Sequence, residues 1–214
     1  MDLPGKNILI TGALGGLGSA FVEALHKENA NLILTDNQDA DLPNYHKVDF
    51  SDTLAITEFA KRLDKIDILI NNAGVGFYKN IQDISYKEWY KTIDIDLNAP
   101  FILIKELLPK YIVNIGSGCS TKPIKGRVGY NTVKSALRGM SLSMSLDFED
   151  ITTIYFNLGS VLTNFGPMSK EDRDRRCEET GKCYLTPEKV AEFLINNIKS
   201  NEPGPEWILH PEGY

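Results

Sequence analysis

The stretch "LITGALGGLG", residues 9–18, decides the fold of this chain. A short apolar run meets a cluster of glycines and leads into a sequence that favours a helix. In α/β proteins such a loop holds a phosphate group, because glycine lets the backbone approach closely and the helix N-terminus carries free N–H groups and partial positive charge. The stretch therefore predicts a nucleotide-binding loop at the end of the first strand.

The glycines of this loop fit two patterns. The first is T-G-x-x-x-G-x-G, with Gly12, Gly16 and Gly18 as its glycines; the second is T-G-x-x-G-x-x-G, with Gly12, Gly15 and Gly18. The two patterns point to different kinds of enzyme, and nothing within the loop separates them.

Short apolar runs alternate with helical patterns along the rest of the chain. The runs are continuously apolar, which is typical of parallel strands that helices cover on both faces. We expect strands at 7–11, 31–36, 66–74, 111–117, 151–160 and 206–210, and helices at 17–29, 53–63, 85–91, 96–109, 130–149 and 187–199. This alternation predicts an α/β fold with a Rossmann-type, doubly wound parallel sheet.

Size and charge narrow the function classes. The 214 residues suit one domain, 1–214, whose core needs no disulfide. The net charge of −6 argues against nucleic-acid binding. No segment approaches the roughly 18 apolar residues of a membrane span, and the first apolar run is too short for a signal peptide. Cys119, Cys177 and Cys183 lack metal-ligand spacing, so we expect free thiols, no metal and a cytoplasmic location.

An acidic residue ends the second expected strand. Asp36 lies 18 residues beyond Gly18, where a carboxylate can accept hydrogen bonds from both ribose hydroxyls of NAD and repel the extra phosphate of NADP. No Arg or Lys lies inside the loop to offset this repulsion. We therefore expect NAD as the cofactor, preferred over NADP. The plainer alternative is that Asp36 only caps the end of its strand.

Several motifs together resemble the short-chain dehydrogenase/reductase family, of the classical type, over residues 6–163. In chain order they are "TGALGGLG" at 11–18, Asp49 in "VDFSD", "NNAG" at 71–74, "NIGS" at 114–117, "YNTVK" at 130–134 and "NLGSVLT" at 157–163. The resemblance implies about seven parallel strands, one of them near Tyr45–Val48. It favours the first glycine pattern and puts Gly15 where NADP-preferring relatives often carry a basic residue.

The resemblance also implies the residues of the site. We expect catalysis from Ser117, Tyr130, Lys134 and Asp96, with Lys134 also binding the nicotinamide ribose. The expected cofactor-binding residues are Gly12, Leu14, Gly15, Gly16, Leu17, Gly18, Asp36, Asp49, Phe50, Asn72, Ala73, Gly74, Tyr130, Lys134, Gly159, Val161 and Thr163.

The chemistry of three of these residues follows from their side chains. Tyr130 and Lys134 are four residues apart, so a helix presents both on one face. A free tyrosine has a pKa of about 10. We expect the nearby ammonium to lower it, so that Tyr130 can exchange a proton with a substrate oxygen. Ser117 can orient the same oxygen. The expected reaction is hydride transfer between a nicotinamide and a carbonyl compound or secondary alcohol.

Two positions depart from the family pattern. Asp96, in "DIDLNAPF" at 94–101, stands where the family has an asparagine that assists the proton relay. An ionised carboxylate accepts hydrogen bonds but cannot donate them. We expect Asp96 to hold the relay water with an altered pH dependence. Leu158 stands where a proline often precedes Gly159, so we expect a less rigid loop there.

The sequence carries weaker signals for the substrate pocket and for the oligomeric state than for the cofactor site. We expect the pocket near Gly76–Tyr78, Cys119, Ser120, Phe165, Met168 and Tyr184. No cluster of arginines is evident, which favours a modest carbonyl compound or secondary alcohol. The polar segment 164–185 suits a lid or substrate loop. Helix 130–149, with the helix that begins near 96, predicts a homodimer or homotetramer by family resemblance.

Two other functions stay open. One is a nicotinamide-nucleotide sensor of the same fold without catalysis, since fold does not fix function. The other is an extended-type enzyme that acts on nucleotide sugars, which the second glycine pattern permits. The Ser117–Tyr130–Lys134 set argues against the first, and "NNAG" with the short chain argues against the second.

Overall fold

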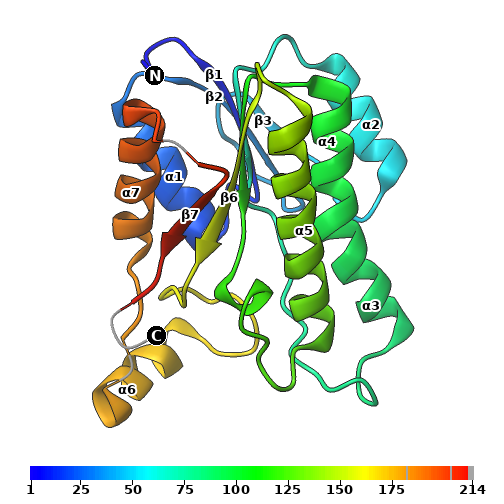
Figure 1. Ribbon diagram of the computed structural model, residues 1–214, viewed down its shortest axis with the longest axis vertical. Coiled ribbons are helices and arrows are strands. Elements are labelled where there is room, and N and C mark those ends of the chain that lie inside the picture. Colours follow the sequence, from blue (N-terminus) through cyan, green and yellow to red (C-terminus); the bar gives the residue numbers. More distant parts are fainter. Residues whose placement is uncertain (182, 203, 212–214) are drawn as a thin grey trace.

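Seven parallel strands form one sheet in the computed structural model of the chain (Figure 1). The structure describes residues 1–181, 183–202 and 204–211. The strands lie in the order β3-β2-β1-β4-β5-β6-β7. Their bounds are β1 (Asn7–Thr11), β2 (Asn31–Asp36), β3 (Tyr45–Lys47), β4 (Ile68–Asn71), β5 (Tyr111–Ile115), β6 (Thr152–Leu158) and β7 (Glu206–Leu209). This arrangement confirms the Rossmann-type α/β fold, including the strand near Tyr45 that only the family resemblance implied.

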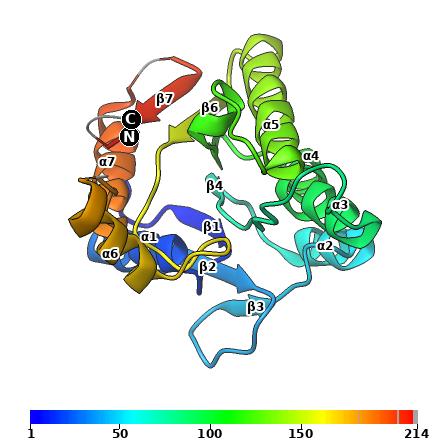
Figure 2. The same cartoon turned by 90° about the horizontal axis from the view of Figure 1, so that it is seen from below.

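Helices cover both faces of the sheet (Figure 2). One group is α1 (Gly16–Lys27) and α7 (Pro187–Ser200), and the other is α2 (Thr53–Arg62), α4 (Ala99–Leu107) and α5 (Val128–Asp147). Ile8 and Ile10 of β1 belong to the core beneath α1 and α7, whereas Leu9 belongs to the core beneath α2 and α4. The continuously apolar strands therefore reflect burial on both faces.

The order of the strands places a crevice at the carboxyl edge of the sheet. The chain runs from β1 outward to β3 and then returns to β4 on the other side of β1. Ligands of open α/β sheets bind at such a switch point. Thr11 ends β1, Asn71 ends β4 and Ile115 ends β5, so the segments that follow these residues meet at one edge.

One helical segment replaces two that the sequence predicts. The expected helices at 85–91 and 96–109 are joined: α3 (Tyr86–Ile93) continues through a π-helical turn (Asp94–Asn98) into α4. A π-helical turn accommodates extra backbone within a helix and is frequent at functional sites. Here the turn carries Asp96, whose side chain is buried.

The polar segment 164–185 contains a helix, α6 (Lys170–Thr180), that the sequence analysis did not predict. Its residues are polar on nearly every side, so no apolar stripe marks it. Two signals do mark its ends: Ser169 and Asp172 form a capping box, and Gly181 has a left-handed φ of 67°. Residue 182 of this segment lies outside the described residues.

Candidate active site

The glycine loop between β1 and α1 has no room for side chains at two of its positions. A Cβ on Gly18 would lie 2.0 Å from the carbonyl oxygen of Gly12, and a Cβ on Gly12 would lie 2.9 Å from the Cα of Ala73. Gly12 also has a φ of 64°, in the region that favours glycine. Close packing on both sides leaves the first residues of α1 lining the crevice.

Gly15 and Gly16 differ in their surroundings. A Cβ on Gly16 would lie 3.0 Å from Cγ2 of Thr163, so this glycine lets the loop after β6 pass over the start of α1. Gly15 has a φ of −69° and a ψ of 162°, which any residue can adopt. The atom nearest to a Cβ on Gly15 is the Gly12 carbonyl oxygen, at 3.3 Å. These surroundings favour the first glycine pattern, in which Gly16 is the motif residue.

The motif "NNAG", residues 71–74, connects the end of β4 to the glycine loop through hydrogen bonds. The side-chain amide of Asn72 donates to the carbonyl oxygens of Thr11 and Gly12, each 3.0 Å away. The Thr11 hydroxyl accepts from the N–H groups of Asn72 at 3.0 Å and Ala73 at 2.9 Å. These four bonds draw the backbone out of the sheet, so β4 ends at Asn71 and does not continue to residue 74 as the sequence predicts.

Asp36 ends β2 and lines the crevice. One of its carboxylate oxygens accepts from the Leu14 N–H at 3.1 Å, and the other accepts from the Asn37 N–H at 2.8 Å. Asp36 therefore also holds the glycine loop in place. Leu14 does not line the crevice, although the sequence analysis placed it among the cofactor-binding residues; its N–H supports Asp36.

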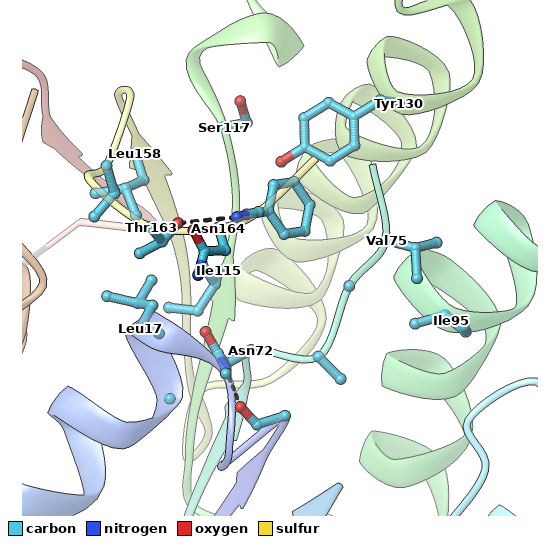
Figure 3. A pocket seen from close by; sticks show the side chains of 18 of the residues that line it. Leu17, Asn72, Val75, Ile95, Ile115, Ser117, Tyr130, Leu158, Thr163 and Asn164 are labelled. Atoms are coloured by element: carbon cyan, nitrogen blue, oxygen red, sulfur yellow. Dashed lines mark hydrogen bonds between the residues drawn. The ribbon is translucent and has the colours of Figure 1, made fainter. Parts of the chain in front are cut away.

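A cavity of about 420 Å³ occupies the crevice. Leu17 and Asn72 lie at one end, and Ser117 and Tyr130 lie at the other (Figure 3). All residues expected to bind the cofactor line this cavity except Leu14, and Ser117, Tyr130 and Lys134 also line it. Further residues that line the cavity were not predicted as site residues: Asn37, Gln38, Val75, Ile95, Ile115, Gly116, Ile124, Arg127, Leu158, Ser160, Asn164 and Arg173.

Ser117, Tyr130 and Lys134 meet at the end of the cavity that lies away from the glycine loop. Ser117 follows β5 and precedes a short 3₁₀ helix (Gly118–Ser120), whose Cys119 N–H donates to the Ser117 hydroxyl at 3.3 Å. Tyr130 lies in the first turn of α5, and Lys134 lies one turn later on the same face. The Tyr130 hydroxyl points into the cavity (Figure 3).

Two aromatic rings enclose Tyr130. The rings of Tyr78 and Phe165 both have their centroids 5.7 Å from its own. Only 7% of Tyr130 is exposed. Burial is the main cause that raises the pKa of Tyr130 well above its ordinary value, and the charge of Asp96 adds to the rise.

The direction of this pKa shift is opposite to the sequence prediction, in which Lys134 lowers the pKa. The Lys134 ammonium lies 5.6 Å from the centre of the Tyr130 ring. It donates to the Ile115 carbonyl oxygen at 3.0 Å and lies 3.2 Å from a carboxylate oxygen of Asp96. The cost of burying a phenolate is the largest contribution to the shift and dominates. The site therefore holds Tyr130 as a neutral phenol.

Asp96 lies behind Lys134 and does not line the cavity. It is 1% exposed, and its second carboxylate oxygen accepts from the Val75 N–H at 2.9 Å. Burial raises the pKa of Asp96, while Lys134 and the Val75 N–H act against the rise. The carboxylate contacts the ammonium directly, at the position where the sequence analysis expected it to hold a relay water.

Tyr155 of β6 supports the same residues, and the sequence analysis did not name it. Its hydroxyl accepts from the Ser117 N–H at 3.0 Å and donates to the Lys134 carbonyl oxygen at 3.2 Å. Its ring occupies the space beside Gly116, where a Cβ would lie 2.1 Å from the nearest ring atom. A tyrosine between the apolar residues Ile154 and Phe156 of this strand was the available signal, because a buried phenol usually needs a hydrogen-bond partner.

The substrate end of the cavity is only partly as the sequence predicts. Tyr78 and Phe165 line it. The other expected pocket residues do not line it: Gly76, Phe77, Cys119, Ser120, Met168 and Tyr184. Arg127 and Arg173 line it as well, whereas the sequence showed no cluster of arginines for this pocket. Arg127 precedes α5 and Arg173 lies in α6, so only the folded chain brings them together.

Residues 6–174 match the family model for short chain dehydrogenases. The chain belongs to the short-chain dehydrogenase/reductase family, and it is an oxidoreductase of that family. It is 32% identical to the 3-oxoacyl-[acyl-carrier-protein] reductase FabG of Rickettsia conorii, over 98% of this chain and 88% of that protein. It is also 32% identical to the dehydrogenase/reductase SDR family member 6 of Rattus norvegicus, over 68% of this chain and 66% of that relative, slightly under two thirds of its length.

Solved structures share the fold of this family member. A short-chain dehydrogenase/reductase, described as a glucose/ribitol dehydrogenase, from Brucella melitensis has a TM-score of 0.88 at 25% identity, over 100% of this chain and 98% of that one. A 4-hydroxyisoleucine dehydrogenase complexed with NADH has a TM-score of 0.84 at 24% identity, over 96% of each chain. A blue fluorescent protein from a metagenomic library, in complex with NADPH, has a TM-score of 0.83 at 22% identity, over 100% and 98%.

We expect Tyr155→Phe to lower kcat by roughly 10-fold and the free energy of unfolding by about 1 kcal/mol. The change keeps the ring against Gly116 but removes the hydroxyl that holds the backbone at Ser117 and Lys134. Steady-state kinetics and urea unfolding measure the two effects. Tyr111→Phe is the matched control, because the Tyr111 hydroxyl is buried without a hydrogen-bond partner in the described part of the chain. Equal kcat values for the two variants would show that Tyr155 does not position Ser117.

Proposed function

We propose that this protein is an NAD(H)-dependent oxidoreductase that interconverts a carbonyl compound and a secondary alcohol by hydride transfer. One observation carries the proposal: a single cavity is lined by the glycine loop and Asp36, and also by Ser117, Tyr130 and Lys134. The first set suits a dinucleotide, and the second suits the proton transfer that accompanies hydride transfer. The residues for binding the dinucleotide and the residues for proton transfer therefore lie in the same cavity.

The residues present fit a dinucleotide. Gly15 and Gly16 line the cavity at the N-terminus of α1, where the free N–H groups and partial positive charge of the helix suit a pyrophosphate. Asp36 would accept from the adenosine ribose, and Lys134 would bind the nicotinamide ribose, as the family resemblance implies. When bound, the nicotinamide supplies or takes up the hydride.

The protein itself supplies position and a proton. In carbonyl reduction, Tyr130 donates its phenolic proton to the substrate oxygen, and the Ser117 hydroxyl donates a hydrogen bond that orients the same oxygen. Lys134 stabilises the phenolate that remains, and Asp96 holds the ammonium in place at 3.2 Å. The raised pKa of Tyr130 suits this direction, because the phenol keeps its proton at neutral pH. Phe165 covers the ring and limits the access of water.

The preference for NAD over NADP is supported by the residues that follow β2. Asp36 is 8% exposed and lines the cavity with a carboxylate that would repel a 2′-phosphate. Asn37 and Gln38, which line the cavity beside it, carry no charge. Gly15 offers no basic side chain either. An additional phosphate would therefore meet one negative charge and no compensating positive charge among these four residues.

We expect the double variant Asp36→Asn/Gly15→Arg to shift the ratio of the NADH and NADPH dissociation constants by about 100-fold toward NADPH. Asn keeps an acceptor for the Leu14 N–H, and the backbone at Gly15 suits any residue. Titrations with both cofactors measure the ratio. Asp39→Asn is the control, since the Asp39 side chain is 88% exposed. Tighter binding of NADPH than of NADH by the wild type would refute the role given to Asp36.

Turnover separates an enzyme from a nucleotide sensor. The test is a panel of short ketones, aldehydes and secondary alcohols, followed through the absorbance of NADH. The proposal expects turnover in the wild type. Tight binding of NADH without turnover on any member of the panel would favour the sensor that the sequence left open.

Assembly, location and domain organisation stay predictions. Phe101 on α4 and Leu146 on α5 are 51% and 87% exposed, and these are the helices predicted to pack in a homodimer or homotetramer. No helix in the described ranges is long and apolar enough to cross a membrane. The cytoplasmic location and the single domain over 1–214 are supported only by the sequence, and residues 212–214 lie outside the described residues.

A further inference from the structure

From the geometry of the substrate end we infer that the substrate carries a carboxylate, which Arg127 and Arg173 bind while Tyr130 acts on a carbonyl or hydroxyl group of the same molecule. The inference rests on the proposed function of the site and names its substrate class. It differs from the sequence prediction of a modest, uncharged carbonyl compound.

Arg127 is half-buried beside the reacting end of the cavity. Its guanidinium lies 3.9 Å from the centre of the Tyr78 ring, and that ring packs against Tyr130. Within the described residues Arg127 has no salt-bridge partner and donates no side-chain hydrogen bond. A guanidinium over an aromatic face keeps the N–H donors at its edge free, and these donors match the two oxygens of a carboxylate. Arg127 thus offers an anion site next to the proton donor.

Arg173 reaches the same cavity from α6. It is 9% exposed, and its Nε donates to the Thr163 carbonyl oxygen at 2.9 Å; an Nη donates to the Phe165 carbonyl oxygen. Among the residues that the structure describes, no carboxylate lies within salt-bridge distance of it. Buried arginines are nearly always paired with an acidic group, because an unpaired buried charge is costly. The two carbonyl groups fix the direction of Arg173, and its guanidinium also lies 5.8 Å from the centre of the Tyr184 ring. No carboxylate among the described residues supplies a counter-charge.

The two arginines lie on the same side of the cavity, beside Tyr78. Arg127 lies over the Tyr78 ring, and Arg173 donates to the carbonyl oxygen of Phe165, whose neighbour Gly166 packs against the hydroxyl end of that ring. Burial raises the pKa of Tyr78, and the charges of Arg127 and then Arg173 act against that rise. The whole chain has a net charge of −6, so two unpaired cations here are not the result of a generally basic surface. Lys134, the third cation that lines the cavity, is already paired with Asp96. A negative ligand beside Tyr78 would supply the missing counter-charge.

Two anions could meet these arginines: a carboxylate of the substrate and the pyrophosphate of the cofactor. The pyrophosphate has its proposed place at the N-terminus of α1, which lines the cavity, and Arg127 lies by Tyr78 and Tyr130 at the other end. The pyrophosphate is a stronger candidate partner for Arg173 than for Arg127. Arg173 donates to the carbonyl oxygen of Thr163, and Thr163 packs against Gly16 at the start of α1. The experiment must therefore measure cofactor and substrate binding separately.

The probes are 2-, 3- and 4-oxopentanoate, each with its methyl ester as a neutral partner of similar shape. Calorimetric titration into the protein with NAD⁺, which cannot reduce them, measures binding without turnover. We expect at least one acid to bind about 100-fold more tightly than its ester. Equal affinity for acid and ester across the panel, or no binding of any acid, overturns the inference.

The variants assign the preference to residues. Arg127→Gln should lower the acid-to-ester affinity ratio by about 100-fold, and Arg127→Lys should recover part of it, since charge returns without the bidentate fork. Lys125→Gln and Arg176→Gln, at exposed neighbouring positions, should keep the ratio of the wild type. An unchanged ratio in Arg127→Gln overturns the role of Arg127.

Arg173→Gln and Arg173→Lys decide between the two anions. A lower acid-to-ester affinity ratio with an unchanged dissociation constant for NADH shows that Arg173 binds the substrate carboxylate. The Lys variant keeps the positive charge and so controls for a displacement of α6 that removal of Arg173 would cause. Weaker NADH binding with an unchanged ratio gives Arg173 to the pyrophosphate and overturns its part of the inference. Preferential acid binding, with no turnover of these acids or of any member of the ketone, aldehyde and alcohol panel, supports the carboxylate site but refutes the proposed function. Turnover without acid preference supports the proposed function but overturns the inference.

Discussion

Tyr130→Phe is expected to lower kcat/KM for carbonyl reduction by roughly 1,000-fold. The variant loses the hydroxyl that gives its proton to the substrate oxygen. It keeps the ring, which packs between Tyr78 and Phe165 with centroids 5.7 Å away. Thermal stability should therefore match that of the wild type, and the dissociation constant for NADH should change far less than kcat/KM. The loss then falls on the chemical step.

Steady-state kinetics, an NADH titration and thermal unfolding separate these effects. Tyr90→Phe is the control, since Tyr90 lies on α3 with 61% of its surface exposed. If Tyr130→Phe keeps more than about a tenth of the wild-type kcat/KM, another group donates the proton.

The pH profile of the wild type tests the same assignment. Because burial holds the pKa of Tyr130 well above its ordinary value, the phenol keeps its proton across the neutral range. Reduction needs the protonated phenol, so its kcat/KM should stay level through neutral pH and fall only in the alkaline range. Oxidation needs the phenolate, so its rate should rise with pH over the same interval. A reduction rate that falls near pH 7 would show that the cofactor complex reverses the direction of the shift.

The sequence predicted most residues that line the glycine-loop end of the cavity, because local backbone demands decide them. Gly12 and Gly18 have no space for side chains, and the Asn72 side chain donates hydrogen bonds to the carbonyl oxygens at the start of the glycine loop. Such requirements leave a fixed pattern of residue types. The Rossmann-type sheet followed for the same reason, since strands buried on both faces read as continuous apolar runs.

The substrate end was predicted poorly because it depends on contacts between distant segments. Tyr155 bonds to Ser117 across the sheet, and Arg173 comes from a helix without an apolar stripe. The pKa of Tyr130 follows from its enclosure by rings from two other segments, which spacing along α5 cannot show. A four-residue spacing indicates which groups are neighbours, but burial decides which of their effects is larger.

Lys134→Met is expected to lower kcat/KM by at least roughly 100-fold and the free energy of unfolding by about 3–5 kcal/mol. The variant removes the ammonium that stabilises the phenolate and binds the nicotinamide ribose in the proposed function. It also leaves Asp96 buried at 1% exposure, with only the Val75 N–H as a hydrogen-bond donor to its carboxylate in the described structure. Breaking one side of a buried ion pair costs more than the pair contributed, because the remaining charge stays out of water.

The loss of stability should depend on pH. Burial already raises the pKa of Asp96 in the folded state, and the loss of Lys134 raises it further. A folded-state pKa above the unfolded value means that the folded form binds the proton more tightly. The stability of Lys134→Met should therefore approach that of the wild type at acidic pH and fall as the pH rises through the folded-state pKa. Urea unfolding across this range measures the slope, and a difference that is constant with pH would mean that Asp96 is not the group responsible.

The double variant Lys134→Met/Asp96→Asn separates the structural role of this pair from the chemical one. Asn removes the unpaired charge and keeps an acceptor for the Val75 N–H, so stability should return to within about 1 kcal/mol of the wild type while activity stays lost. Asp96→Asn alone completes the cycle. It removes a charge that raises the pKa of Tyr130, so the alkaline fall of the reduction rate should move to lower pH. A profile identical to that of the wild type would confine Asp96 to holding the ammonium in place, with no influence on the proton that Tyr130 transfers.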